Sequence, residues 1–175
     1  RPDSAETISS LKSAGDNCVL VTGDKKEIAD SLSKQLNIDH THSEVLPDEK
    51  ANIVTSYQDQ GFIVAMVGDG INDAPAIAQA DVGIAMGSGT DIAMETGEIV
   101  LAHGDLKAVL RATRLASATF NKIKQNLFWA FIYNIIAIPL AFAGVLHPVM
   151  AEVAMALSSI NVVGNSNRLK SVKLN

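Results

Sequence analysis

The sequence predicts an α/β fold built on a parallel sheet, followed by two helices that cross a membrane. Residues 1–105 alternate apolar runs with amphipathic segments, which is typical of a parallel sheet covered by helices. Residues 127–146 are twenty residues without a formal charge, enough to span about 30 Å of hydrocarbon. The net charge of the chain also changes sign, from negative before Asn121 to positive after it. From Asn121 onward there are five basic residues and one acidic residue, whereas nine basic and 18 acidic residues precede it.

The composition excludes several classes of protein. The chain has 175 residues and a net charge of −5, and its acidic first part offers no basic face for a nucleic acid. The single cysteine, Cys18, excludes an internal disulfide. No secretory signal leads the chain, and because it begins at Arg1 we expect it to be a piece of a longer protein.

The first sixty residues are expected to alternate helix and strand. The spacing predicts a helix over 3–14, a strand over 17–22 and helices over 25–36 and 48–60. Asp3 with Glu6 resembles a capping box for the first helix, and Gly15 is its stop signal. His40 and His42 fall in the expected loop after the second helix. We interpret them as surface residues, with a paired-histidine metal site as the alternative.

Three further strands complete the α/β part. They are predicted over residues 62–67, 82–86 and 99–101. The second of them is followed by the polar stretch Gly87-Ser88-Gly89-Thr90-Asp91. Strands that alternate with helices in this way predict a parallel sheet with helices on both faces.

The strand over 62–67 ends at the loop Gly68-Asp69-Gly70-Ile71-Asn72-Asp73-Ala74-Pro75. Carboxylates at the carboxyl end of a parallel strand lie where open α/β sheets bind their ligands. Asp69 and Asp73 are four residues apart and can share one small, highly charged target, and Mg²⁺ with a phosphate fits best. An ordinary turn is the alternative. The spacing does not fit a calcium-binding loop, and the third glycine of a dinucleotide fingerprint is missing.

Two other sites are expected at the same edge. Thr22-Gly23-Asp24 follows the first strand, and a hydroxyl with glycine backbone N–H groups can hold phosphate oxygens. Lys50 lies early in its helix and can act as a point charge for phosphate. Taken singly, each has a simpler interpretation, a turn and a solvated lysine.

The loop GDGINDAP resembles the hinge motif GDGxNDxP of P-type ATPases, the ion pumps that form an aspartyl-phosphate. Thr22, Lys50 and the pair Asp69/Asp73 also match, in order, the second, third and fourth signatures of the haloacid-dehalogenase-like fold. The resemblance therefore implies that residues 1–105 are the carboxyl-terminal part of a phosphorylation domain.

The resemblance also implies roles for the matching residues. Asp69 would be the Mg²⁺ ligand, and Asn72 and Asp73 would hold the loop and orient the waters of the metal. The phosphoryl oxygens would be held by the residues of the other two signatures, Thr22, Gly23, Asp24 and Lys50. The family sequence TGDN reads TGDK here, with Lys25 in place of the asparagine.

The family's nucleophile lies in a DKTGT motif, which this chain lacks, as it lacks the TGE loop of the actuator and a nucleotide-binding domain. The resemblance implies that these lie upstream and that the upstream aspartate attacks the γ-phosphate of ATP. The fragment alone is therefore expected to be inactive, and the upstream parts of the same pump are its expected partners.

The rest of the chain is expected to enter a membrane. We predict an amphipathic stalk helix over 106–125, transmembrane helices over 126–147 and 148–165, and a basic tail over 166–175. Basic residues precede the first span and follow the second, so the soluble part and the tail should be cytoplasmic, with the turn at His147 outside. These predictions describe a multi-pass membrane protein whose helices contact lipid. The alternative is a pair of helices in a soluble protein.

Polar groups inside the predicted spans indicate function, because they are costly in hydrocarbon. Tyr133 and Asn134 lie in the middle of the first span, and Pro139 leaves the carbonyl of Ile135 without its usual helical partner. On the second span, three residues share one helix face: Met155, Ser158 and Ser159. A thioether beside amide and phenol oxygens suits a soft ion such as Cu(I). Helix packing is the alternative.

Two patterns resemble the last two helices of copper-transporting heavy-metal ATPases. They read Asn126, six residues, Tyr133-Asn134, four residues, Pro139, and then Pro148, six residues, Met155, two residues, Ser158-Ser159. Zinc and cadmium relatives carry a lysine and an aspartate-glycine motif instead, and neither occurs here. The resemblance implies that Tyr133, Asn134, Met155 and Ser159 belong to a membrane copper site, completed by a CPC motif in an earlier helix.

Glu152 lies toward the outer end of the second predicted span. We interpret it as an interfacial glutamate in contact with water, with a role in releasing the metal outward as the alternative.

The sequence therefore predicts part of an ATP-driven pump that moves Cu(I) outward, with Mg²⁺ and ATP as cofactors and a copper chaperone as a further partner. The alternatives are a pump for Ag(I) or another soft cation, and a truncated, non-catalytic membrane protein that binds metal.

Overall fold

The computed structural model of the chain describes residues 3–87, 95–101, 105–144 and 147–172. It divides into two compact units, Arg1–Leu110 and Arg111–Asn175. Each unit is described by itself. The polar stretch expected after the strand over 82–86 falls mostly outside the described residues, of which it retains Gly87.

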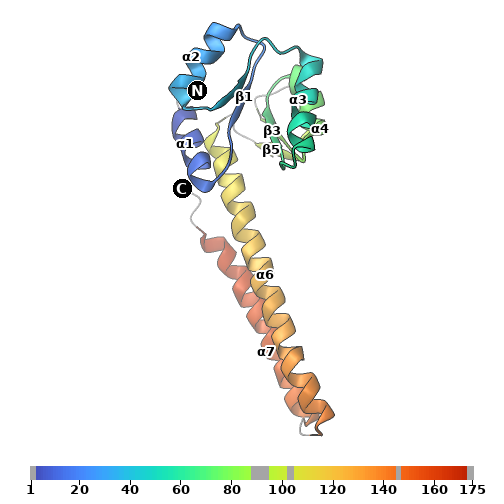
Figure 1. Ribbon diagram of the computed structural model, residues 1–175. Coiled ribbons are helices and arrows are strands. Elements are labelled where there is room, and N and C mark those ends of the chain that lie inside the picture. The colour runs from blue at the N-terminus through green and yellow to red at the C-terminus, as the bar shows by residue number, and fades with distance from the viewer. Residues whose placement is uncertain (1–2, 88–94, 102–104, 145–146, 173–175) are drawn as a thin grey trace. The chain divides into compact units, whose positions relative to one another are not determined.

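The first unit consists of parallel strands with helices packed beside them, as predicted (Figure 1). Its elements, in chain order, are α1 (Ser4–Ala14), β1 (Val19–Val21), α2 (Lys26–Leu36), β2 (His40–His42), α3 (Pro47–Asp59), β3 (Ala65–Gly68), the 3-10 helix η1 (Ile71–Asp73), α4 (Ala74–Gln79), β4 (Val82–Met86) and β5 (Ile99–Leu101).

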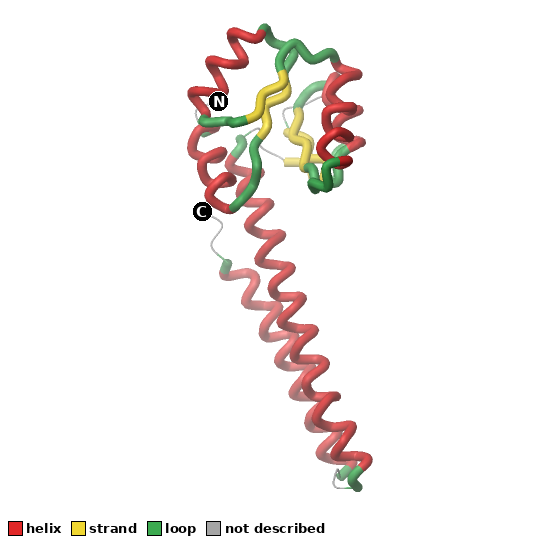
Figure 2. Tube along the Cα trace, viewed as in Figure 1, coloured by secondary structure: helices red, strands yellow, loops and turns green. Residues whose placement is uncertain are grey.

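The strands form two parallel sheets rather than one. β1 pairs with β2, and β3, β4 and β5 pair in that order (Figure 2). In the first sheet Val21 lies opposite His42, and in the second Gly68 lies opposite Ala85. We predicted one sheet. Among the described residues, no strand pairs with both β1 and β3, so the strands are divided between two sheets.

The segment with His40 and His42 is a strand, not the loop that we expected. It extends the first sheet, and the backbone N–H of Thr22 donates to the carbonyl of His42 over 2.9 Å. Two histidines between polar residues give no apolar alternation, which is why the pattern did not indicate a strand. The Nε2 of His42 lies 3.2 Å from the hydroxyl of Tyr57 on α3, so this histidine packs into the fold.

The core of the first unit is small and lies between α3, α4 and the sheet of β3 to β5. α4 contributes the buried residues Ala74, Ala76 and Ile77, of which the two alanines are small and Ile77 is among the largest fully buried side chains. A Cβ at Gly83 of β4 would be 2.6 Å from the carbonyl oxygen of Ile77, so this strand approaches α4 at a distance that only glycine permits.

The ends of α1 are partly as predicted. Gly15 ends the helix with a left-handed φ of 99°, and its N–H donates to the carbonyl of Leu11 or Lys12 in the last turn. The capping box was wrong, because the Asp3 side chain makes no cap bond to its own helix. Its Oδ2 accepts from the N–H groups of Leu106 (2.8 Å) and Lys107 (3.3 Å) instead.

Those two N–H groups lie at the start of α6 (Lys107–Phe142). Asp3 therefore caps two N–H groups of a helix more than a hundred residues away in the chain, and Asp105 Oδ1 accepts from the N–H of Ala108 in the same turn. The ion pair between Glu6 Oε2 and Lys107 Nζ, 2.6 Å long, supports the same contact. Both residues of the expected capping box thus serve a tertiary contact within the first unit.

The second unit holds most of α6, then α7 (Pro148–Asn167) and the 3-10 helix η2 (Arg168–Ser171). The predicted stalk and first span form one continuous helix of 36 residues, because no helix breaker separates them. The helix ends at Phe142, where Gly144 takes a left-handed φ of 69°. Among the described helices, α6 is the one that is long and apolar enough to cross a membrane.

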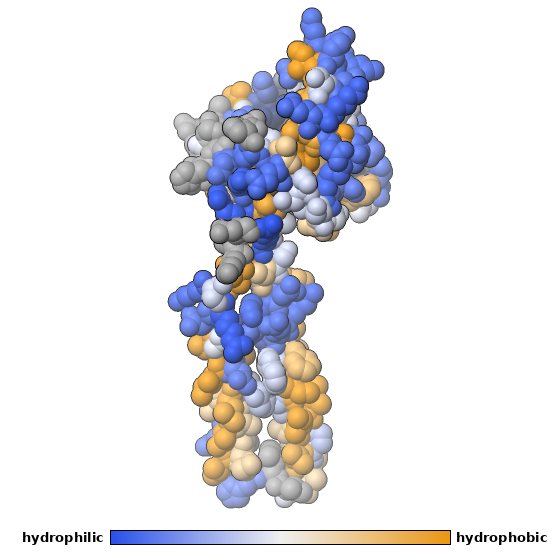
Figure 3. All heavy atoms as spheres, turned by 90° about the vertical axis from the view of Figure 1, so that its left-hand side faces the viewer, coloured by the Kyte–Doolittle hydropathy of each residue, from blue (hydrophilic) through white to orange (hydrophobic). Residues whose placement is uncertain are grey.

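α6 and α7 run antiparallel and are joined by hydrogen bonds between polar side chains (Figure 1). The half-buried positions that make this seam are Lys122, Asn126, Ala130, Tyr133 and Ala137 on α6, Ala154, Ser158, Val162 and Asn165 on α7, and Leu169 on η2. Small residues let helix backbones approach closely in the absence of a hydrophobic driving force. Figure 3 shows hydrophobic side chains over most of both helices and a hydrophilic band where α7 ends.

Candidate functional site

Lys50 and Asp73 form a half-buried ion pair at the carboxyl end of β3. The Nζ of Lys50 donates to Oδ1 of Asp73 over 2.6 Å, and both side chains are 14% exposed. α3 supplies Lys50 from its first turn, after Pro47 at the helix start. η1 supplies Asp73 from its last residue. The structure thus brings together two residues, 23 positions apart, that the sequence assigned to one site.

The other oxygen of Asp73 holds the loop that follows β3. Oδ2 lies 3.4 Å from the backbone N of Asp69 and 3.3 Å from that of Gly70, both of which donate to it. A Cβ at Gly68 would lie 2.5 Å from the Cβ of Asp73, so residue 68 must be glycine for this side chain to reach the loop. The glycine at residue 68 therefore has a steric cause, whereas a Cβ at Gly70 would make only an ordinary contact, 3.6 Å from Oδ2 of Asp73.

Asp69 and Asn72 are exposed at the rim of this loop. Their carboxylate and amide oxygens are the ligand types that Mg²⁺ prefers. Among the described residues, no cluster of three or more histidine, cysteine or acidic side chains could hold a metal ion. The donor set fits Mg²⁺ nevertheless, because this ion is commonly bound through one or two carboxylates together with phosphate and water.

Thr22, Gly23 and Asp24 form a turn at the carboxyl end of β1. The Thr22 hydroxyl donates to Oδ2 of Asp24 over 2.9 Å and accepts from the backbone N of Asp24 over 3.1 Å. The turn is tied to the segment before α3, because the N of Val45 donates to the carbonyl of Thr22. Both sheets therefore end in polar turns, but the hydrogen bonds of the Thr22 side chain stay within its own turn.

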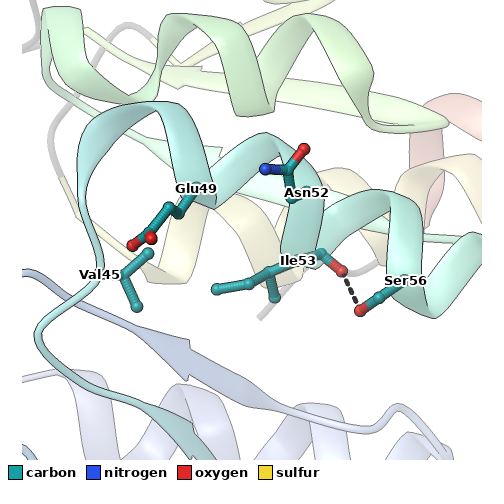
Figure 4. Close-up of a pocket in the computed structure, with 5 residues that line it drawn as sticks. All are labelled: Val45, Glu49, Asn52, Ile53 and Ser56. Atoms are coloured by element: carbon teal, nitrogen blue, oxygen red, sulfur yellow. Dashed lines mark hydrogen bonds between the residues drawn. The ribbon is translucent and has the colours of Figure 1, made fainter.

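A shallow pocket of about 360 Å³ lies beside α3 and is lined by Val45, Glu49, Asn52, Ile53 and Ser56 (Figure 4). None of these residues belongs to the predicted site. The helical residues among them lie on a different face of α3 from Lys50 and the buried Val54. The pocket is therefore separate from the ion pair, and we assign it no role.

In the second unit, three of the predicted metal residues lie on one flank of the helix pair. Tyr133, Ala154 and Ser158 are seam positions, and Asn134, Met155 and Ser159 are the residues that follow them. Each next residue is rotated by about 100° about its helix axis. Because α6 and α7 run in opposite directions and face each other, this rotation turns the residue after a seam position toward the same side of the pair on both helices. Asn134, Met155 and Ser159 therefore lie on one flank.

The chemistry of that flank is an amide oxygen, a hydroxyl oxygen and a thioether. Met155 is 71% exposed, and Asn134 and Ser159 are exposed as well. The Nδ2 of Asn134 donates to the carbonyl of Ala130, and the hydroxyl of Ser159 donates to the carbonyl of Met155. Because both donors are bonded within their own helices, these two side chains can offer oxygen lone pairs to a ligand.

Tyr133 lies in the seam. Its hydroxyl accepts from Nδ2 of Asn161 over 2.8 Å. Ser158 is also a seam residue, whereas Glu152 is exposed in the early part of α7. The five predicted metal residues are thus divided between the seam and the flank next to it.

Sequence reasoning missed a group of polar side chains that join the two helices. Asn165 donates to Asn126 and accepts from Lys122, and Asn126 donates to Ser166. The three distances are 3.0 Å for Lys122 to Asn165 and 2.8 Å for each of the others. Asn161 and Asn165 are four residues apart in an apolar helix, and that spacing was the signal that could have revealed them.

Comparison with known proteins matches both units. A family described as haloacid dehalogenase-like hydrolase matches residues 1–81. The "Copper-exporting P-type ATPase" of Legionella pneumophila is 49% identical over 97% of the chain. The "Probable copper-importing P-type ATPase A" of Enterococcus hirae is 52% identical over 99% of it. The chain spans about a quarter of the length of these curated relatives, 24% of each.

A solved structure resembles nearly the whole chain. It is the crystal structure of a zinc-transporting PIB-type ATPase in the E2.Pi state, with a TM-score of 0.90 and 37% identity. The match covers 97% of this chain and 28% of that one. The resemblance therefore extends over both the loop that follows β3 and the helix pair.

Proposed function

The chain belongs to the P-type ATPases, and on that premise we propose that it is the carboxyl-terminal part of an ATP-driven pump that moves Cu(I) outward across a membrane. One observation carries the proposal: the half-buried Lys50–Asp73 pair beside the exposed Asp69 carboxylate of residues 68–75, the phosphate loop, at the carboxyl end of β3. A positioned cation next to a carboxylate loop suits the transfer of a phosphoryl group, because it stabilises the charge on the phosphoryl oxygens.

At this site the chain's own residues position and neutralise a phosphoryl group. An upstream aspartate, in a DKTGT motif outside this chain, attacks the γ-phosphorus of ATP, the bond to the bridging oxygen breaks and ADP leaves. Asp73 holds Lys50 and the loop, and Asn72 supports the same loop. When Mg²⁺ is bound beside Asp69, it supplies charge neutralisation.

The turn after β1 completes the phosphate site in the intact protein. Thr22 offers its hydroxyl and Gly23 its backbone N–H to phosphoryl oxygens, whereas Asp24 keeps the Thr22 side chain in place through the 2.9 Å hydrogen bond. Lys50 supplies the positive charge. The fragment alone, which lacks the nucleophile, forms no phosphoenzyme.

The flank of the helix pair is the proposed cargo site. Met155 supplies a soft thioether, which favours Cu(I) over a hard cation, and Asn134 and Ser159 supply oxygens. Tyr133 and Ser158 reach the site from the seam, and an upstream CPC motif provides the thiolates. Glu152 lies toward the outer end of α7 and accepts the ion on its way out.

The proposed function implies the following division of the chain into domains. Residues 1–105 complete a cytoplasmic phosphorylation domain, and residues 106–125 are its stalk. Residues 126–147 and 148–165 cross the membrane, and the basic tail 166–175 returns to the cytoplasm. Lipid surrounds the helix pair, the upstream domains of the same pump bind ATP, and a copper chaperone delivers the cargo.

A phosphorylation assay on the intact protein in its native membrane tests the proposal. We expect radiolabelled ATP to produce a hydroxylamine-sensitive band on an acidic gel that depends on Cu(I). Lys50→Ala should slow the appearance of the band roughly 100-fold, as for loss of a preorganised electrostatic group. Labelling that requires Zn(II) and does not respond to Cu(I) would mean that the pump transports zinc, as the solved structural relative does, rather than copper. No label with any of Cu(I), Ag(I) or Zn(II) would overturn the pump.

A second assay tests direction and the role of Glu152. In sealed inside-out vesicles an outward pump accumulates Cu(I) in the lumen when ATP is added outside. Glu152→Gln should slow this accumulation without changing the amount of phosphoenzyme. Equal transport rates in the variant and the wild type would remove the release role, and accumulation only in right-side-out vesicles loaded with ATP would reverse the direction.

A further inference from the structure

Asn161 makes a contact across the helix pair at the level of the cargo site. Its Nδ2 donates to the hydroxyl of Tyr133 over 2.8 Å. No part of the predicted site included Asn161. An amide side chain in an apolar helix is costly in hydrocarbon unless it finds a partner, and Tyr133 is that partner.

The Tyr133 side chain is restrained from two directions. The ring of Trp129, one helical turn earlier, lies 6.4 Å from its ring centre at an angle of 38°. The Asn161 amide holds its hydroxyl from the other helix. Restraint of both the ring and the oxygen fixes where the phenol oxygen lies.

The neighbouring polar side chains do not share this task. Asn134 donates to Ala130, and Ser159 donates to Met155, each within its own helix. The amide of Asn165 donates to Asn126, one turn farther along α7. Among the contacts in the described part of the helix pair, the one that reaches Tyr133 from α7 is the amide of Asn161.

We propose that Asn161 is a positioning residue for the cargo site, which orients the phenol oxygen of Tyr133 toward the transported Cu(I). The inference rests on the proposed function. The amide N–H occupies one lone pair of the phenol oxygen, so the other lone pair points in a defined direction. Groups that orient a ligand in this way support metal affinity without touching the metal.

The test uses the intact pump, purified and reconstituted in lipid vesicles. Two quantities are measured for each variant: the half-saturating Cu(I) concentration for ATP hydrolysis, and Cu(I) affinity by competition with a chromophoric chelator. We expect Asn161→Ala to raise the half-saturating concentration about three-fold to ten-fold, the range of an interhelical hydrogen bond in a membrane, with kcat unchanged. Asn161→Gln, which keeps the donor, should recover part of the loss.

A double-mutant cycle shows whether Asn161 acts through Tyr133. Tyr133→Phe removes the phenol oxygen, so Asn161→Ala should add nothing to it. Asn165→Ala is the matched control, because it removes an interhelical amide bond of the same kind one turn away and should leave the half-saturating concentration unchanged.

Several outcomes would overturn the inference. The first is an unchanged half-saturating Cu(I) concentration in Asn161→Ala, and the second is full additivity of the two substitutions in the cycle. The third is an effect of Asn165→Ala as large as that of Asn161→Ala. The fourth is an effect of Asn161→Ala larger than that of Tyr133→Phe, because it would make Asn161 a direct ligand. If these appear while Cu(I) stimulates the wild type, the proposed function stands. If Cu(I) does not stimulate the wild type, both fall.

Discussion

The α-carbon of Gly68 lies against the side chain of Asp73. A methyl group at residue 68 would be 2.5 Å from the Cβ of Asp73 and 3.0 Å from its carboxyl carbon. Asp73 in turn holds Lys50 and the backbone of Asp69 and Gly70. The end of β3 and the phosphate loop are therefore one packing unit, in which glycine at residue 68 makes room for the carboxylate.

Gly68→Ala tests this unit. We expect it to displace Asp73, to lower phosphoenzyme formation by the intact pump, and to cost about 1–3 kcal/mol of stability from overpacking. Gly15→Ala is the control, because an L-residue at its φ of 99° loses stability through backbone strain away from the site. If both variants lose phosphorylation in proportion to their loss of folded protein, the packing of Gly68 has no special role in the chemistry.

Lys50→Ala tests the half-buried ion pair between Lys50 and Asp73. The variant leaves the Asp73 carboxylate without its cation, and we expect the rate of phosphorylation to fall roughly 100-fold, as for loss of a preorganised electrostatic group. Lys50→Arg keeps the charge but not the shape and should fall in between. Lys12→Ala, which breaks the pair with the exposed Asp39, should leave the rate unchanged. A normal rate in Lys50→Ala contradicts the assignment.

Asp81 gives a stability term that depends on pH. The backbone N–H of Val64 and the side chain of Gln58 both bond to its carboxylate and lower its pKa below the ordinary 3.8. A depressed pKa stabilises the folded state above pH 3.8, and this stabilisation is lost as the pH falls through the lower, folded value. Denaturant titrations of the wild type and Asp81→Asn should therefore converge in acid. Parallel curves at all pH values would contradict the link.

Asp3→Ala tests the cap of α6. The N–H groups of Leu106 and Lys107 lose their acceptor, so we expect their hydrogen exchange to become faster while the middle of α6 stays protected. Asp59→Ala, at the end of α3, is the control and should leave these two amides unchanged. Exchange at the same rate in the wild type and Asp3→Ala would show that another group, or water, caps the helix.

Asn126 and Asn165 test the contact between the helices. Their hydrogen bond joins α6 to α7, and a double-mutant cycle with alanine at both positions should give a coupling of about 0.6 kcal/mol, the average for such bonds in membranes. The measurement is the unfolding of the intact protein in detergent. Independent effects of the two substitutions would mean that the seam is held by its small residues alone.

Local signals made much of the phosphate loop predictable. Asp69 and Asp73 follow an apolar run directly, and the two glycines between and before them mark a sharp turn, so their place at the end of β3 could be read from the sequence. The contact of Lys50 with Asp73 was harder to predict, because the distance between them depends on how α3 packs against η1. That packing is tertiary, and the family resemblance carried the prediction.

Long-range contacts were not predictable in the same way. Asp3 reads as the start of α1, yet its carboxylate caps α6, because a capping residue serves whichever helix terminus the fold brings near. The pairing of Asn161 with Tyr133 depends on the register of two helices that no local pattern specifies. His40 and His42 form a strand only because β1 lies beside them.

The division of the strands into two sheets has a consequence for handling the chain in isolation. β1 and β3 each pair on one side among the described strands, so each presents a row of backbone donors and acceptors to any extended segment. In an intact pump such a segment would come from the same polypeptide. In a preparation of the chain alone it would come from a second copy, and we expect self-association through these edges, growing with concentration.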